Sequence, residues 1–242
     1  MVAPQRISVP ALVAITANTA LTGTIDPPRH LANASVYLFS GSKDTTVHPG
    51  VVRKLETYLG HYIANPQTQL RAEYDVPAEH AWVTERFGSA CAVNGPPYIN
   101  RCNFSLALHA LSHILPGVTN RSEFVDRNLR TFSQVPFALG RVPAATGLDE
   151  QGFAYVPTAC QAATERCRLH IAFHGCDQGR SFVGDTFARH SGLSELAEAN
   201  GIVVLFPQAV PSAVPLNPKG CWDWWGLCAS AVQAPRCMLL KC

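Results

Sequence analysis

Two side chains with acid–base potential follow two predicted strands. Asp44 lies in a Gly/Ser-rich loop just after the apolar run Val36–Phe39, and His80 lies just after the alternating segment Leu70–Val76. In parallel α/β sheets, sites form in the loops at the carboxyl ends of the strands. A carboxylate beside an imidazole fixes the tautomer of the ring and stabilises the imidazolium that proton transfer creates. We therefore predict an acid–base dyad. The alternative is that Asp44 is a helix N-cap and His80 an ordinary surface residue.

A turn that could bind an oxyanion follows a third predicted strand. The sequence His174-Gly175-Cys176 ends the apolar segment Arg168–Phe173. Lipases and esterases use a His-Gly turn after a strand to place a backbone N–H at the oxyanion position. The glycine lets the backbone approach a ligand closely. The alternative is a strand-end turn without a chemical role.

The nucleophile that would complete such a site is missing from the sequence. No Gly-x-Ser-x-Gly turn, the usual setting of an attacking serine, occurs among the 242 residues. Ser191 and Ser194 fall within a predicted helix, and Ser40 and Ser42 belong to the loop of Asp44. The sequence thus indicates most of an acyl-transfer site without its serine.

Three tryptophans, Trp222, Trp224 and Trp225, lie close together in NPKGCWDWWG. Neither a strand face nor a helix face can bury all three at that spacing. We predict that some of them line a cleft and bind a ligand or an apolar polymer. The alternative is a packed corner that Cys221 fastens.

The elements that must position these residues alternate along the chain. Strands are predicted at 36–39, 70–76, 168–173 and 202–206, helices at 11–21, 51–62, 105–115 and 187–200, and a loop-rich region at 117–159. Strands that alternate with helices favour a parallel α/β sheet. The length fits one large domain or two small ones.

Composition narrows the classes of partner. Hydrophobic residues make up 47% of the chain and charged residues 15%, with a net charge of +2, so there is no basic field for nucleic acid. No apolar run of about 18 residues exists, so we expect no membrane span. The segment Met1–Gly23 is broken by Pro10, Thr16 and Asn18 and lacks the continuous apolar core of a signal peptide.

The nine cysteines favour disulfides in an oxidising compartment. The short spacings Cys91/Cys102 and Cys160/Cys167 are not Cys-x-x-Cys pairs, and no histidine lies at zinc-finger spacing from them. A Cys/His metal-binding protein remains an alternative, and it predicts stoichiometric zinc in the purified chain.

Taken together, the motifs resemble the secreted poly(3-hydroxybutyrate) depolymerases, in the branch whose α/β-hydrolase domain is circularly permuted. The resemblance covers roughly residues 25–226, in the order of that family. The matching stretches are ASVYLFSGSKDTTVHPGVV, VPAEHAWVTERFGSAC, PPYINRCNFSLALHALSHIL, GLDEQGFAYVPTACQAATERCRLHIAFHGCDQ, FVGDTFARHSGLSELAEANGIVVLFPQA and NPKGCWDWWG.

The resemblance implies an α/β fold with an incomplete α/β-hydrolase-like parallel sheet. It implies that Asp44 is the catalytic acid and His80 the base, that Cys176 offers its backbone N–H to the oxyanion, and that the tryptophan cluster lines the substrate crevice. The implied substrate is a polyester or a short hydroxyacid ester, cleaved through an acyl-enzyme without metal or cofactor by a secreted monomer. The implied disulfides are Cys91–Cys102, Cys160–Cys167 and Cys176–Cys221.

The sequence departs from this family at both ends. Because the family places its serine elbow before the segment that here begins at Met1, we expect a partial hydrolase domain over 1–226, truncated at its N-terminus. Residues 227–242 form a divergent tail that adds Cys228, Cys237 and Cys242. The tail indicates a frameshift or an alternative exon, or else ordinary divergence. The chain is then either a fragment of a hydrolase or a non-catalytic relative that binds polyester.

Overall fold

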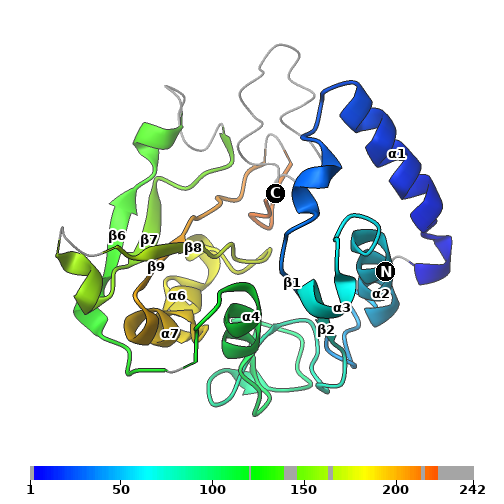
Figure 1. Ribbon diagram of the computed structural model, residues 1–242. Coiled ribbons are helices and arrows are strands. Elements are labelled where there is room, and N and C mark those ends of the chain that lie inside the picture. Colours follow the sequence, from blue (N-terminus) through cyan, green and yellow to red (C-terminus); the bar gives the residue numbers. More distant parts are fainter. Residues whose placement is uncertain (1–2, 120, 139–145, 163–165, 214–215, 223–242) are drawn as a thin grey trace. The chain divides into compact units, whose positions relative to one another are not determined.

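The computed structural model describes residues 3–119, 121–138, 146–162, 166–213 and 216–222 (Figure 1). The chain divides into two compact units, which we call unit 1 (Met1–Val118) and unit 2 (Thr119–Cys242). No helix among the described residues is long and apolar enough to cross a membrane.

Unit 1 is an α/β unit built around parallel strand pairs. Its elements are α1 (Val9–Leu21), β1 (Val36–Phe39), α2 (Pro49–Leu59), α3 (Pro66–Gln69), β2 (Leu70–Glu73), β3 (Trp82–Thr84), β4 (Ser89–Ala90), β5 (Ile99–Arg101) and α4 (Leu106–Ile114), with short 3-10 turns at Pro4–Arg6 and Pro28–Leu31. A second small sheet has the parallel order β3-β5-β4.

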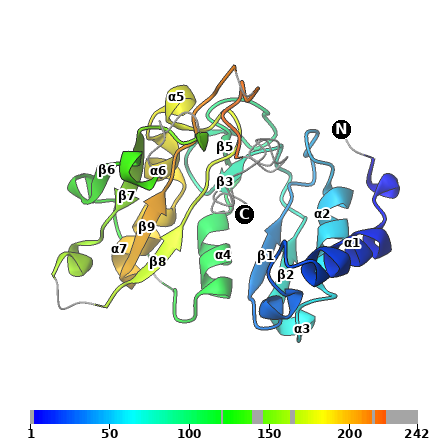
Figure 2. The same ribbon diagram turned by 90° about the horizontal axis from the view of Figure 1, so that it is seen from above.

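The strands β1 and β2 run parallel and in step, from Val36 opposite Leu70 to Phe39 opposite Glu73. Helices α2 and α4 both contact β1, and Figure 2 shows them on opposite sides of the strand pair. Because the two strands end together, the loops that follow them leave the sheet at the same edge.

Polar caps set where the helices of unit 1 begin. Ser105 accepts a hydrogen bond from Leu108 N–H (3.3 Å) at the start of α4, and the ring of His48 accepts one from Gly50 N–H (3.0 Å) at the start of α2. Each cap pairs a backbone donor that the first turn of a helix leaves free. Since His48 caps α2, Asp44 is not a helix N-cap.

The core of unit 1 lies next to the loop that follows β2. Val76 and Ala78 of that loop form a buried cluster with Val83 and Leu106, and Phe39 of β1 packs against it. The half-buried disulfide partners, Cys91 and Cys102, also pack on this cluster. Apolar burial therefore holds the backbone just ahead of His80 in place.

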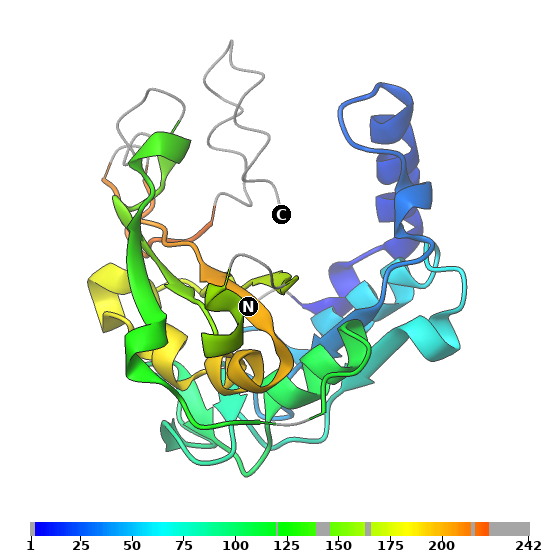
Figure 3. The ribbon, with the colours of Figure 1, turned by 60° about the vertical axis from the view of Figure 1, so that its left-hand side comes forward.

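Unit 2 contains a four-stranded mixed sheet in the order β6-β7-β9-β8. Its elements are β6 (Leu129–Ser133), β7 (Gln151–Tyr155), β8 (Arg168–Ile171), α5 (Arg180–Val183), α6 (Thr186–His190), α7 (Leu193–Asn200) and β9 (Ile202–Phe206), with 3-10 turns at Asp126–Asn128, Val135–Phe137 and Thr158–Gln161. β8 and β9 pair in parallel, whereas β7 pairs antiparallel with both β6 and β9. The long green ribbon of β6 forms one edge of this sheet (Figure 3).

The antiparallel strands correct one prediction. The region 117–159, predicted to be loop-rich, contains β6 and β7, so the sheet is not purely parallel. Gly152 in β7 suggests a turn by its type, but a Cβ at that position would lie 2.7 Å from the ring of Phe132. The glycine is there because an aromatic side chain crosses the strand.

The predicted helix over 187–200 is also corrected, because the structure has two helices, α6 and α7. Gly192, between them, has a positive φ of 83°, which an α-helix cannot accommodate. The strands predicted at Val36–Phe39 and Ile202–Phe206 are confirmed at those bounds.

Candidate active site

The structure brings the predicted acid and base together at the edge of unit 1. The Nδ1 atom of His80 lies 2.8 Å from Oδ2 of Asp44. The side chain of Asp44 is 8% exposed and that of His80 is 46% exposed. The other carboxylate oxygen, Oδ1, accepts hydrogen bonds from the N–H groups of Thr46 (2.9 Å) and Val47 (2.7 Å). Both oxygens of Asp44 are therefore engaged, which fixes the orientation of its carboxylate.

Backbone hydrogen bonds join the two loops that carry this pair. Ser42 N–H donates to Val76 O (2.8 Å), and Lys43 N–H donates to Ala78 O (3.1 Å). The loops approach so closely at Gly41 that a Cβ there would lie 2.1 Å from the carbonyl oxygen of Ala78. The separation of Asp44 and His80 thus follows from main-chain contacts as well as from their own hydrogen bond.

The imidazole of His80 has the partner and the exposure that a base requires. The hydrogen bond to Asp44 is the largest cause that raises the pKa of His80, burial opposes it, and the charges of Asp44 and Glu79 add to the increase. Because Oδ2 of Asp44 accepts, the neutral ring carries its proton on Nδ1. The half-exposed ring therefore leaves Nε2 for proton transfer.

In unit 2 the strand β8 leads into the predicted oxyanion turn. Gly175 N–H donates to the side-chain oxygen of Gln178 (2.9 Å), and Asp177 N–H donates to Lys219 O (2.8 Å). The N–H of Cys176, between these two occupied donors, has no hydrogen-bond acceptor within the described part of unit 2. The Cys176 N–H thus lies in an exposed turn between two occupied donors, where it could donate to an oxyanion.

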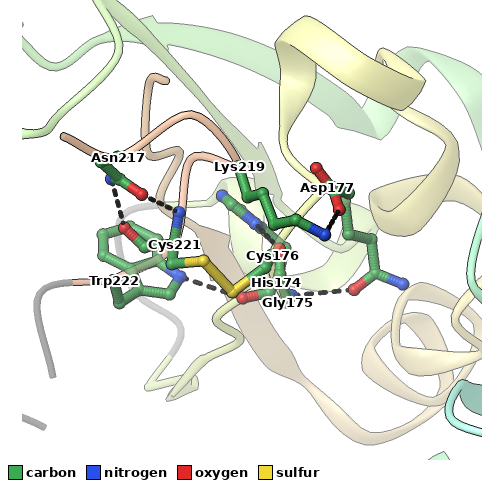
Figure 4. Close-up of a disulfide and its surroundings, with 9 residues drawn as sticks. His174, Gly175, Cys176, Asp177, Asn217, Lys219, Cys221 and Trp222 are labelled. Carbon is green, nitrogen blue, oxygen red and sulfur yellow. Dashed lines mark hydrogen bonds and ion pairs between the residues drawn. A yellow bond between two sulfur atoms is a disulfide. The ribbon is translucent and has the colours of Figure 1, made fainter. Parts of the chain in front are cut away.

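A disulfide and an indole hold this turn (Figure 4). Cys176 is bonded to Cys221, and the next residue, Trp222, donates its Nε1–H to the carbonyl oxygen of His174 (3.0 Å). The indole also packs edge-on against the ring of Phe173, with centroids 4.9 Å apart. The polar atom of Trp222 is thus used to anchor the turn.

His174 is buried beneath the turn and stays neutral there. Its Nε2 accepts a hydrogen bond from Ala209 N–H (3.1 Å), and its Nδ1 lies 2.7 Å from Gly175 O, so the proton is on Nδ1. Burial lowers the pKa of His174, against the opposing effects of Gly175 O and the charge of Asp149. A protonated ring would lose the bond from Ala209.

The remaining predictions concern the tryptophan cluster, the disulfide pairings and a metal site. Trp224 and Trp225 lie outside the described residues. The three disulfides, Cys91–Cys102, Cys160–Cys167 and Cys176–Cys221, are confirmed, and they remove six cysteines from any zinc site. Among the described residues, no group of three His, Cys, Asp or Glu could hold a metal ion.

Two residues that contribute to these arrangements escaped sequence reasoning. Glu79, next to His80, has a carboxylate that contacts the loops of both members of the pair. Gln178, which is buried, clamps Gly175. Their types gave no signal, because a polar residue beside a candidate base is ordinarily solvated.

The chain is similar to known polyester-degrading proteins. It is 38% identical over 227 residues to a poly(3-hydroxybutyrate) depolymerase of Delftia acidovorans, covering 93% of this chain and 44% of the relative. It is 32% identical over 209 residues to a polyhydroxybutyrate depolymerase of Talaromyces funiculosus, covering 81% and 60%. The chain therefore spans about half the length of these curated relatives. No family model matches it.

Solved structures give the same result. The crystal structure of the PHB depolymerase from Penicillium funiculosum matches with a TM-score of 0.76 and 30% identity, over 87% of this chain and 70% of that one. A PHB depolymerase complexed with an R3HB trimer matches equally well. The mixed α/β arrangement is thus the α/β-hydrolase-like fold of these proteins, and with sequence identity of 30–38% over most of its length the chain belongs to the poly(3-hydroxybutyrate) depolymerase family.

Proposed function

We propose that this chain supplies the acid, the base and an oxyanion donor of a carboxylic ester hydrolase. Its substrates are poly(3-hydroxybutyrate)-type polyesters and short hydroxyacid esters. The observation that carries the proposal is the 2.8 Å hydrogen bond between His80 and the buried carboxylate of Asp44, which leaves Nε2 of the ring accessible. The relatives named as depolymerases, one of them complexed with an R3HB trimer, support the choice of substrate.

The proposed mechanism proceeds through an acyl-enzyme. Nε2 of His80 takes the proton of a serine hydroxyl as its oxygen attacks the ester carbonyl carbon. Asp44 stabilises the imidazolium, which then gives that proton to the departing alcohol oxygen as the ester C–O bond breaks. A water molecule, deprotonated by the same ring, then attacks the acyl-serine carbonyl. The acyl–serine C–O bond breaks, the serine oxygen takes that proton back from the ring, and the free acid leaves. For the Cys176 N–H of unit 2 we propose the role of an oxyanion donor, which in acyl-transfer enzymes contributes about 2.7–4 kcal/mol per donor.

The nucleophile is the component that this sequence does not contain in a recognisable form. An acyl-enzyme route needs a serine on a sharp strand-to-helix turn, and no Gly-x-Ser-x-Gly occurs here. We therefore place the serine outside these 242 residues. The three disulfides support a location outside the cell, in an oxidising environment.

The first test uses a fluorophosphonate probe, which labels activated serines. We expect no labelling of the 242-residue chain. We expect stoichiometric labelling of the natural-length protein, by which we mean this chain together with the segment that carries the proposed serine. Labelling of the short chain would show that it holds an unrecognised nucleophile and would contradict the proposed division. Hydrolysis of a poly(3-hydroxybutyrate) film by the natural-length protein, lost in His80→Ala, tests the activity itself.

A second candidate function is binding of polyester without turnover, which the missing serine elbow favours. The nucleotide sequence upstream of the Met1 codon distinguishes the two. An open frame with Gly-x-Ser-x-Gly supports the hydrolase. A stop codon or unrelated sequence leaves only binding, which sedimentation with polymer granules would measure.

A further inference from the structure

Glu79 joins the loop of the acid to the loop of the base. Its side chain belongs to a residue that is only 9% exposed, and one carboxylate oxygen, Oε2, accepts from both Thr45 N–H (3.0 Å) and His80 N–H (3.0 Å). The other oxygen, Oε1, accepts from the hydroxyl of Thr45 (2.7 Å). Thr45 directly follows Asp44, so a single carboxylate contacts the neighbour of the acid and the backbone of the base.

The charge on this carboxylate is maintained without a cationic partner in the described part of unit 1. Burial opposes ionisation, but the hydrogen bonds from Thr45 and His80 outweigh it and lower the pKa of Glu79. Removing the hydrogen-bond partners of a buried charge is strongly destabilising. Glu79 therefore restricts the positions of the groups that donate to it. Those groups are the two loops that carry the dyad.

We infer that Glu79 is a positioning residue for the dyad: its buried carboxylate fixes the spacing of the Asp44 and His80 loops and so maintains the 2.8 Å hydrogen bond between them. The importance of this for catalysis rests on the proposed function, whereas the geometric effect does not. Glutamate suits the role because two acceptor oxygens face three donors. Glutamine keeps only one acceptor oxygen, so its NH₂ group could face only the Thr45 hydroxyl, which would then accept instead of donating, and the charge would be lost.

Glu79 could also act on His80 through its charge alone. The titratable groups that influence the ring are Asp44 and Glu79. Glu79→Gln removes the charge and one acceptor, whereas Glu79→Asp keeps the charge on a side chain one methylene shorter. A carboxylate set back by one methylene lengthens its hydrogen bonds to Thr45 and His80 unless the loops move. The two variants therefore separate charge from reach.

The experiment follows the ring of His80 by NMR in the ¹⁵N-labelled chain, measuring its pKa and the resonance of Nδ1–H bound to Asp44. In Glu79→Gln we expect the pKa to fall toward the ordinary 6.5 and the Nδ1–H resonance to broaden or vanish. In Glu79→Asp we expect the pKa to fall less but the Nδ1–H resonance still to weaken. Folded variants that keep both wild-type values would overturn the inference.

Glu198→Gln is the matched control. Glu198 is a similar hub in unit 2, where its carboxylate accepts from Tyr155 (2.8 Å), Asn128 (3.0 Å) and Thr158 (3.2 Å), and its pKa is also lowered, against burial, by these bonds. Its loss should weaken the fold without moving the signals of the dyad. Equal changes in this control would show a general loss of structure and overturn the inference.

Thr45→Val keeps the inference testable if the Glu79 variants do not fold. It removes only the hydroxyl donor to Oε1 and leaves every charge in place. We expect a weaker Nδ1–H resonance of His80 with little change in its pKa, and an unaltered resonance would contradict the inference.

Turnover separates this inference from the proposed function. In the natural-length protein, Glu79→Asp should lower kcat by about tenfold or more with KM for a short ester unchanged, because general-base catalysis depends on the ring's placement. If the wild type shows no hydrolysis while the NMR signals still depend on Glu79, the proposed function fails and the positioning role stands. If the Glu79 variants hydrolyse the ester with the wild-type kcat and keep the wild-type NMR signals of His80, only the positioning role is refuted.

Discussion

At the scale of single residues, two histidines of this protein are held in opposite ways. His80 donates Nδ1–H to a buried carboxylate, and its ring is half exposed, so its charged form is favoured. His174 accepts a backbone N–H and lies buried, so its neutral form is favoured. The same side chain thus serves as a titrating group in one place and as a neutral support for a turn in the other.

The pH dependence of hydrolysis should report on His80. A base must be neutral, so activity is present above its raised pKa and is lost as pH falls through that value. In the natural-length protein we expect the acidic limb of kcat/KM for a short ester to have its midpoint above about 6.5. Asp44→Asn should lower kcat by about 10³–10⁴ and move this midpoint downward. An unmoved midpoint would exclude Asp44 as the partner that sets the pKa.

The indole of Trp222 should contribute to stability through one hydrogen bond. Trp222→Phe keeps a ring against Phe173 but removes the donor to the carbonyl oxygen of His174. We expect a loss of about 1 kcal/mol in the free energy of unfolding, measured by denaturant titration.

Lys219→Met is the control for Trp222→Phe. It removes a 3.0 Å ion pair with Asp177 whose lysine side chain is 65% exposed, and such pairs contribute little. If Lys219→Met costs as much as Trp222→Phe, the indole bond has no special role in holding the turn.

At the scale of elements, the dyad depends on two loops that leave parallel strands in step and then bond to each other. Gly41 is where they meet most closely, because any Cβ there would collide with the carbonyl of Ala78. This contact links the conformation of the loop after β1 to that of the loop after β2.

Gly41→Ala should therefore separate the loops. We expect a loss of about 1–3 kcal/mol in the free energy of unfolding, as for other overpacked sites, together with a weakened Nδ1–H resonance of His80. Gly95→Ala is the matched control in the same unit, because a Cβ there meets nothing within 4 Å. A Gly41→Ala variant that matches Gly95→Ala in both measurements would contradict the close approach.

The sequence predicts elements where one physical signal dominates. β1 and β9 are continuous apolar runs between turn residues, so their bounds are correct. β7 was missed because Gly152 reads as a turn residue, although it accommodates the ring of Phe132. The pairing of Asp44 with His80 follows from residue type and strand-end position, but the burial of Glu79 depends on tertiary contacts that no local pattern records.

At the scale of the whole molecule, the two units should respond to acid differently. Burial lowers the pKa of His170, His174 and His190 in unit 2, so their stabilising effect is complete above about 6.5 and is lost as pH falls below it. The raised pKa of His80 in unit 1 has the opposite sign: its contribution is complete below about 6.5 and is lost as pH rises through the folded-state value.

His170→Phe tests the acid response of unit 2. Burial lowers the pKa of the His170 ring, so protonation of this ring in the unfolded chain destabilises unit 2 as pH falls. A phenylalanine cannot be protonated, so the amides of β9 should lose less protection from exchange in the variant than in the wild type between about pH 7.5 and 5.5. Residue-resolved hydrogen exchange, corrected for intrinsic rates, measures this. Burial raises the pKa of Glu195, so protonation of this residue stabilises unit 2 as pH falls. Because Glu195 is present in both the wild type and the variant, it does not change the difference in protection between them. An unchanged loss in the variant would exclude His170 as a contributor.

The bond between Cys176 and Cys221 also bears on maturation. It fastens the turn that presents the Cys176 N–H to the segment of Trp222, two stretches separated by 45 residues in the chain. Disulfides persist where the surroundings are oxidising and are kept reduced in the cytosol. Under reducing conditions this bond would be open, so the turn reaches its final rigidity only where the surroundings are oxidising.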